Sequence, residues 1–184
     1  MDLEQFSEEE TNQIIAYGIE RGKVILITTL LALMLGYVFG IFFQGIIFWA
    51  CLSALRRYAG GYHADTQNRC YVISFIMVVL SLVSIRQITN IGLIGLLFQT
   101  ISLCTILFLA PVENQNRVLD QSEKKKYGAK TKRIAMFLSS TYVILYIVNK
   151  QEIAIPIGVA SFVVAILLIA GYLKGQNRKS KCKI

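Results

Sequence analysis

Long apolar runs separated by short polar segments dominate the chain. The longest run, from Val24 to Leu55, holds 32 residues without one Asp, Glu, Lys or Arg. As a single helix it would extend about 48 Å, whereas the hydrocarbon core of a bilayer is about 30 Å thick. Gly36 and Gly40 lie near its middle. The pattern therefore predicts two membrane spans that fold back on each other near Gly40.

Four further apolar runs predict spans of their own: Tyr71 to Ile85, Ile91 to Ala110, Ile134 to Val148 and Ile153 to Leu173. Pro111 follows the second of these runs, where a helix is expected to end. Pro156 falls in the first turn of the last run, where proline is tolerated. We therefore expect an all-α fold, in which residues 1–184 form a single polytopic integral membrane domain of about six transmembrane helices.

The N-terminal segment 1–23 has a different pattern. Ile14, Ile15 and Ile19 would share one face of a helix that extends to about Ile19. This stripe is typical of an amphipathic helix on a membrane surface, but a turn that leads into the first span fits it equally well. The acidic start and the missing cleavage site argue against a signal peptide.

Composition and charge support a membrane protein. Only 16% of the residues are charged, against about 25% in ordinary soluble domains. If the N-terminus is cytoplasmic, all but two of the 19 Lys and Arg residues fall in segments on the cytoplasmic side. These are segment 1–23, segment 56–70, a basic loop at 112–133 and a basic tail at 174–184. The positive-inside rule therefore predicts that both termini are cytoplasmic, and the net charge of +8 needs no nucleic-acid partner.

Several classes of site are disfavoured. None of the predicted spans contains an Asp, Glu, Lys, Arg or His, which argues against a transporter or channel. The four cysteines form no CxxC pair, and the chain has one histidine, so we expect neither a metal site nor another cofactor.

Segment 56–70 reads RRYAGGYHADTQNRC and holds the best candidate for catalysis. The only histidine, His63, precedes Cys70 by seven residues, and a histidine can take the proton of a thiol nucleophile. In one continuous helix their Cα atoms would lie about 10.5 Å apart along the axis, which is too far for a hydrogen bond. Gly60 and Gly61 can instead form a turn that returns His63 toward Cys70.

The surroundings of Cys70 also favour a reactive thiol. Cys70 opens a predicted span, and the positive end of a helix dipole stabilises a thiolate. Arg69, Arg56 and Arg57 act in the same direction, although Arg56 could equally be a topological anchor. The candidates that could orient the histidine are Asp65, Gln67 and Asn68. Spacing and chemistry alone leave open an inert cysteine and a histidine that merely sits at the membrane interface.

The segment resembles the active-site segment of the AgrB family, integral membrane cysteine endopeptidases of Gram-positive quorum-sensing systems. The family pattern is an arginine, a Gly-Gly pair, one residue, a histidine, six residues and a cysteine. The matching residues here are Arg56 or Arg57, Gly60, Gly61, His63 and Cys70. The resemblance covers most of the chain, since the length, the several spans and the later basic segment also fit.

The resemblance implies a function. Cys70 would be the nucleophile and His63 the general base in removing the C-terminal tail of an AgrD-like precursor, by way of an acyl-enzyme thioester. A thiolactone or lactone ring would then close to give the autoinducer. The resemblance further implies a multi-pass protein of the Gram-positive cell membrane. Its partners would be membrane lipids and a second copy of the chain in a homodimer. The alternatives are a non-catalytic membrane scaffold and a small peptide transporter or exporter.

The precursors of this family have an acidic tail, which suggests a role for the basic segment. We hypothesise that its cations hold that tail: Lys124, Lys125, Lys126, Lys130, Lys132 and Arg133. The alternative is a segment that sets the topology and faces lipid headgroups.

Overall fold

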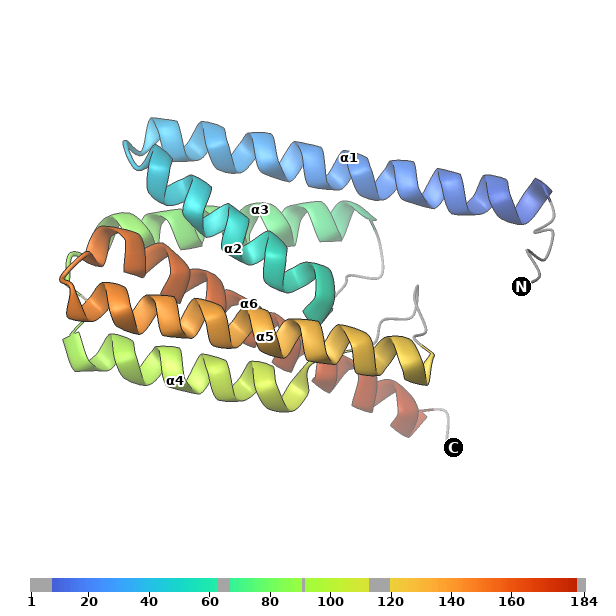
Figure 1. Ribbon diagram of the computed structural model, residues 1–184. Coiled ribbons are helices and arrows are strands. Elements are labelled where there is room, and N and C mark those ends of the chain that lie inside the picture. Colours follow the sequence, from blue (N-terminus) through green and yellow to red (C-terminus); the bar gives the residue numbers. More distant parts are fainter. Residues whose placement is uncertain (1–7, 63–66, 91, 113–119, 182–184) are drawn as a thin grey trace.

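The computed structural model describes residues 8–62, 67–90, 92–112 and 120–181. These residues form six α-helices and no named strand, as predicted (Figure 1). The helices are α1 (Glu8–Val38), α2 (Phe42–Ala59), α3 (Gln67–Gln87), α4 (Gly92–Leu109), α5 (Gln121–Ile147) and α6 (Gln151–Lys181). The all-α class is therefore confirmed.

The helices run up and down through one bundle (Figure 1). The start of α1, the end of α6 and the connections α2–α3 and α4–α5 share one end of the bundle, which we call the basic end. Arg86 at the end of α3 and Lys150 before α6 lie at the opposite end. These two cations, which lie outside the four basic segments, are thus at the other end of the bundle from those segments. The positive-inside rule expects such a separation.

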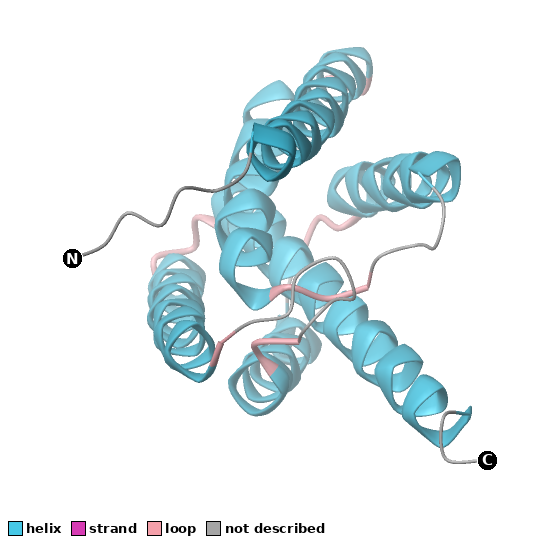
Figure 2. Cartoon of the chain, turned by 90° about the vertical axis from the view of Figure 1, so that its right-hand side faces the viewer, coloured by secondary structure: helices cyan, strands magenta, loops and turns pink. Residues whose placement is uncertain are grey.

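α6 forms the centre of the bundle and packs against α2, α3, α4 and α5 (Figure 2). The large side chains that are fully buried come from four of the helices: Phe48, Leu55, Leu82, Ile106, Val164 and Leu168. The outer surface is apolar as well, since Phe43, Leu93 and Phe108 are 77%, 77% and 86% exposed. A bundle that is apolar both inside and outside suits a lipid environment.

Two helices in the described part of the chain are long and apolar enough to cross a membrane. They are Gly92–Leu109, with a mean hydropathy of 2.1, and Gln151–Gln176, with a mean hydropathy of 2.8. Shorter apolar stretches occur at Ile25–Val38 and Tyr71–Gln87. The six predicted spans thus correspond to six helices, while the crossing of the membrane by all six and the cytoplasmic placement of the termini stay predictions.

The fold-back near Gly40 is confirmed. α1 ends at Val38, Gly40 adopts a φ of 70°, and the amide of Ile41 donates to the carbonyl of Gly36 at 2.9 Å. Gly36 is buried against Gly45 of α2. A Cβ on Gly45 would lie 3.5 Å from the Cα of Gly36. Gly36 therefore brings α1 and α2 of one chain together, and Gly40 makes the turn between them.

Three predicted boundaries differ from the structure. α1 is continuous from Glu8 to Val38, so the N-terminal segment and the first span are one helix. α5 begins at Gln121, so residues 121–133 are helical where we expected a loop. α6 continues to Lys181, so the tail is helical to that point. Lys, Arg, Glu and Gln are good helix formers, so the edge of an apolar run does not mark the end of a helix.

Candidate functional site

The helix that leads into the candidate site ends where the glycine pair begins. α2 stops at Ala59, and Gly60 and Gly61 adopt φ values of 73° and 118°. Such angles favour glycine because a Cβ disfavours them. The predicted break at Gly60–Gly61 is therefore confirmed, and a continuous helix through segment 56–70 is excluded. α3 begins at Gln67, which puts Cys70 in its first turn, where the helix dipole favours a thiolate.

The predicted catalytic pair itself falls outside the described part. His63 and Asp65 lie outside the described residues, as do the side chains of Gln67, Asn68 and Cys70. The approach of the imidazole to the thiol therefore stays a prediction. The structure does describe the chain directly before His63.

Gly60 is fixed against the segment that follows α4. It forms an isolated parallel bridge with Val112, whose amide donates to the carbonyl of Ala59 at 3.0 Å. A Cβ on Gly60 would overlap the carbonyl oxygen of Val112. The first glycine of the pair is thus required both for its backbone angle and for this close approach.

The next two residues lie against α6. The amide of Tyr62 donates to the carbonyl oxygen of Leu167 at 2.9 Å. Gly61 is buried, and a Cβ on it would meet the same carbonyl oxygen at 3.2 Å. On the α6 side, a Cβ on Gly171 would lie 2.8 Å from both the carbonyl carbon of Gly61 and the amide nitrogen of Tyr62. The loop after α2 lies across α6 at this contact (Figure 2).

Two cations hold the remaining groups of Tyr62. Nη2 of Arg56 donates to the carbonyl oxygen of Tyr62 at 3.2 Å. Nζ of Lys174 lies 4.9 Å from the centroid of the Tyr62 ring, which is a cation–π distance. Arg56 thus shapes the turn directly, whereas Arg57 is exposed.

The basic start of α5 borders the same segment. The rings of Tyr58 and Tyr127 lie 5.9 Å apart, and Nζ of Lys130 is 5.2 Å from the centroid of the Tyr58 ring. Lys124, Lys125 and Lys126 are exposed one turn earlier on α5. The structure therefore brings the basic helix and the candidate active-site segment together, although they are far apart in the sequence.

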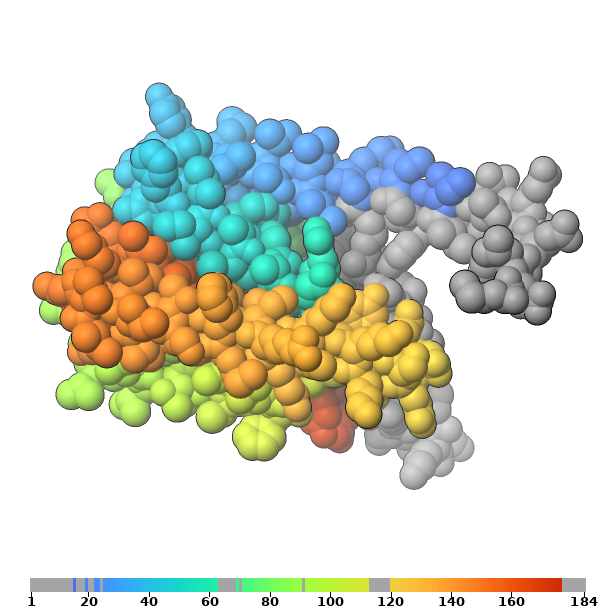
Figure 3. All heavy atoms as spheres, in the orientation of Figure 1, coloured from blue at the N-terminus to red at the C-terminus, as the bar shows by residue number. Residues whose placement is uncertain are grey.

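The first half of α3 is more exposed than its second half. It follows the connection from the end of α2, which lies beside the start of α5 on the face that Figure 3 shows. On α3, no residue from Tyr71 to Met77 is buried, whereas Val78, Leu82 and Ile85 are. α3 therefore packs mainly through its later half, whereas its residues from Tyr71 to Met77 are half-buried or exposed.

Sequence reasoning did not anticipate the α6 side of the site. Leu167, Gly171 and Lys174 lie more than 100 residues after Tyr62, and Val112 lies about 50 residues after it. Gly171 carried one weak signal, because a glycine inside a helix costs about 1 kcal/mol and usually has a packing reason. Nothing in the pattern indicated its partner.

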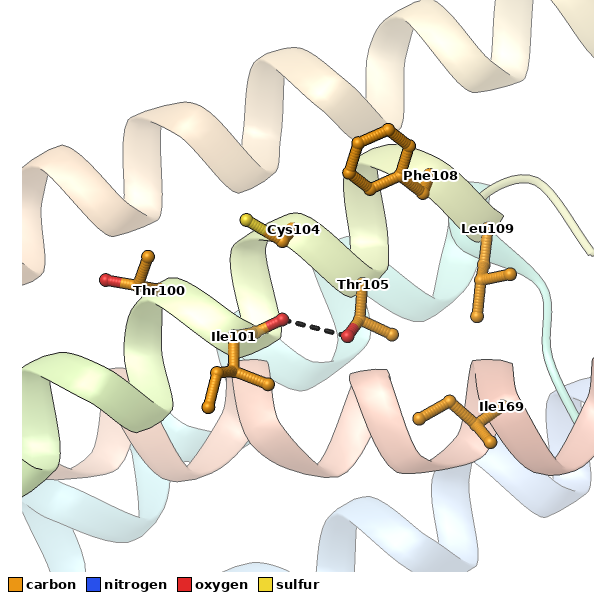
Figure 4. A pocket seen from close by; sticks show the side chains of 7 residues that line it. All are labelled: Thr100, Ile101, Cys104, Thr105, Phe108, Leu109 and Ile169. Atoms are coloured by element: carbon orange, nitrogen blue, oxygen red, sulfur yellow. Dashed lines mark hydrogen bonds between the residues drawn. The ribbon is translucent and has the colours of Figure 1, made fainter.

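A separate groove runs along α4 beside α6 (Figure 4). It has a volume of about 400 Å³ and is lined by Thr100, Ile101, Cys104, Thr105, Phe108, Leu109 and Ile169. Its walls are almost entirely apolar, and it includes no described residue of segment 56–70. In the described part of the chain, no three His, Cys, Asp or Glu side chains gather in a way that could hold a metal ion.

Similar proteins are found for almost the whole chain. The family model of accessory gene regulator B (AgrB) matches residues 2–172. AgrB-like protein 2 of Clostridium perfringens (strain 13 / Type A) is 27% identical over 161 residues, covering 82% of this chain and 75% of that protein. An AgrB-like protein of Clostridium perfringens (strain SM101 / Type A) is 26% identical over 170 residues, covering 83% and 79%. No solved structure matches the chain significantly.

Proposed function

The chain belongs to the AgrB family, and from this premise we propose that it is a membrane cysteine endopeptidase that matures a quorum-sensing signal peptide. The family is membrane-associated, processes peptides for quorum sensing and acts on an AgrD-like precursor. The proposal rests on the position of the family motif in this fold. Gly60 and Gly61 interrupt the helical structure between α2 and α3, separated from His63 by one residue, and Cys70 lies in the first turn of α3.

In the proposed reaction, the sulfur of Cys70 attacks the carbonyl carbon of the bond that precedes the precursor's tail. His63 takes the thiol proton and delivers it to the leaving amine as the carbon–nitrogen bond breaks. The product is an acyl-enzyme thioester. A thiol or hydroxyl of the precursor then attacks this thioester, which closes the ring and returns the thiol to Cys70. Water must be excluded for cyclisation to compete with hydrolysis, and an interfacial site suits that demand.

A precursor that cannot close its ring tests the proposal. If its internal nucleophile is replaced by alanine, the acyl group has no intramolecular acceptor, so we expect the thioester on Cys70 to accumulate. Mass spectrometry of the intact chain, reconstituted in lipid, would show the added acyl mass, and hydroxylamine would remove it. The unaltered precursor is the control and should leave little adduct. Cleavage with no adduct on the chain in either case would contradict the covalent mechanism, and export of an uncleaved precursor would favour a transporter.

We further propose that the basic start of α5 binds the acidic tail of the precursor. The support is the contact of Lys130 with Tyr58, which places this charge beside the segment that carries the motif. Because the attraction would hold the substrate and the transition state equally, its loss should raise KM and leave kcat almost unchanged.

Replacing Lys124, Lys125 and Lys126 together by glutamine should raise KM several-fold, since each removes one exposed charge–charge attraction. Cleavage rates at several precursor concentrations would measure this effect, and added salt should weaken binding to the unaltered protein. Exchanging Arg86 and Lys150, the two cations at the opposite end, for glutamine is the control. If KM is unchanged and the variant inserts normally, the charges set the topology and face lipid instead.

A further inference from the structure

We infer that α6 positions the general base of the proposed reaction, and that Gly171 is the residue that permits this. The inference rests on the proposed function, because it concerns how His63 is held. In it Gly171 is a positioning residue, which acts on the reaction only through the backbone of Gly61 and Tyr62.

The contact between the loop and α6 is a backbone-to-backbone contact. In a regular helix the carbonyl of Leu167 accepts the amide of Gly171, and here it also accepts the amide of Tyr62 at 2.9 Å. A second donor can reach this carbonyl only where the helix surface has no side chain in the way. Gly171 supplies that opening, since a Cβ there would lie 2.8 Å from the amide nitrogen of Tyr62.

The glycine on the loop side completes the fit. Gly61 is buried with a φ of 118°, and its own Cβ would meet the Leu167 carbonyl oxygen at 3.2 Å. The glycines on the two sides of the contact thus allow the loop to lie on the helix at backbone distance. This geometry explains why Gly171 stands in an otherwise apolar stretch of α6.

Tyr62 is held at three points. Its amide is held by Leu167, its carbonyl by Arg56, and its ring by Lys174, one turn beyond Gly171. All three of these residues belong to α6 or the end of α2. Tyr62 itself contacts no substrate in the proposed reaction, so this degree of restraint points to the residue that follows it.

His63 follows Tyr62 directly, and consecutive Cα atoms are only about 3.8 Å apart. Any displacement of Tyr62 is therefore passed on to His63. A methyl group on Gly171 would have to move the loop by roughly 0.5–1 Å to reach normal contact distances. A misplacement of about 1 Å can cost a catalytic group about 100-fold in rate.

The matched pair Gly171→Ala and Gly175→Ala tests this. Both positions lie on α6, one turn apart, and both changes favour the helix by about 1 kcal/mol. A Cβ on Gly175 would meet nothing within 4 Å. We expect Gly171→Ala to lower precursor cleavage by about 100-fold. Gly175→Ala should stay within about twofold of the unaltered protein, as expected for an exposed site.

A second readout separates positioning from a general structural defect. In a chain that lacks Cys51, Cys104 and Cys182, iodoacetamide alkylation reports the thiolate of Cys70 alone. Gly171→Ala should slow alkylation in this background, but it should have no further effect once His63 is alanine. Such non-additivity is expected when one residue acts through another. Equal slowing with and without His63 would overturn the inference.

The outcomes distinguish this inference from the proposed function. If Cys70→Ala abolishes cleavage while Gly171→Ala cleaves normally, the inference fails and the function stands. If Cys70→Ala cleaves normally, the function fails. Should Gly171→Ala not accumulate, Lys174→Gln takes its place, because it removes the contact with the Tyr62 ring without adding volume. It should slow cleavage several-fold, and an unchanged rate would count against the inference.

Discussion

Cys70→Ala is expected to abolish maturation of the precursor. Removing the nucleophile of a thiol enzyme leaves no group to form the acyl intermediate, and losses of about 1,000-fold or more are usual. His63→Ala should lower the rate by about 100- to 10,000-fold, the contribution of a general base. Co-expression with the precursor, followed by immunoblotting of the cleaved tail, would measure both.

The other cysteines supply the controls for this result. Cys104 is exposed on α4, outside segment 56–70, and Cys182 belongs to the basic tail. Alanine at either position should leave processing unchanged. Full processing by Cys70→Ala would rule out the enzyme and favour a scaffold. Loss of processing in all three variants, with normal insertion, would point to a structural role for thiols instead of a nucleophile.

The number of helices could be predicted because membrane spans have a length set by the bilayer. The run Val24 to Leu55 is too long for one span, so it had to fold back, and Gly40 was the available hinge. Pro111 ended α4 for a similarly local reason, since a proline cannot continue a helix. These features depend on neighbouring residues alone.

The ends of α5 and α6 could not be predicted in the same way. The apolar runs begin at Ile134 in α5 and end at Leu173 in α6. α5 nevertheless begins in the basic segment before Ile134, and α6 continues into the basic segment after Leu173. A lysine-rich segment is a good helix former in water, so the change in polarity is no signal of a helix end. The helical start of α5 holds Lys130 against Tyr58, which places the basic residues beside segment 56–70.

Only the part of the site that depends on neighbouring residues could be predicted. The glycine pair indicated a turn before His63, and the turn at Gly60 and Gly61 is present. The surface that holds this turn comes from α6 and from Val112, through contacts between residues far apart in the chain. A hydrogen bond to the backbone carbonyl of Leu167 places no demand on the identity of that side chain. The sequence therefore carries almost no signal for the contact between this loop and α6.

Gly60→Ala is the most direct test of that held turn, and Gly40→Ala is its control at another glycine with a positive φ. The φ values are 73° at Gly60 and 70° at Gly40, and Gly60 combines its φ with a ψ of −137°. Alanine is disfavoured at any positive φ, and a strained backbone of this kind costs about 1–3 kcal/mol. At Gly40 a Cβ meets nothing within 4 Å, whereas at Gly60 it overlaps the carbonyl oxygen of Val112.

Gly40→Ala therefore shows the effect of a Cβ at a positive φ in open space, and Gly60→Ala adds the overlap with Val112 to its own backbone strain. We expect Gly40→Ala to insert and to process the precursor within a few-fold of the unaltered rate, because it lies at the end of the bundle opposite the site. Gly60→Ala should lose processing by about 100-fold or more, since the turn must move away from Val112 and carry His63 with it. Membrane yield and thermal stability of the two variants would show whether both fold. If they fold and process the precursor equally, neither the backbone angle of Gly60 nor its close approach to Val112 has a part in holding the site.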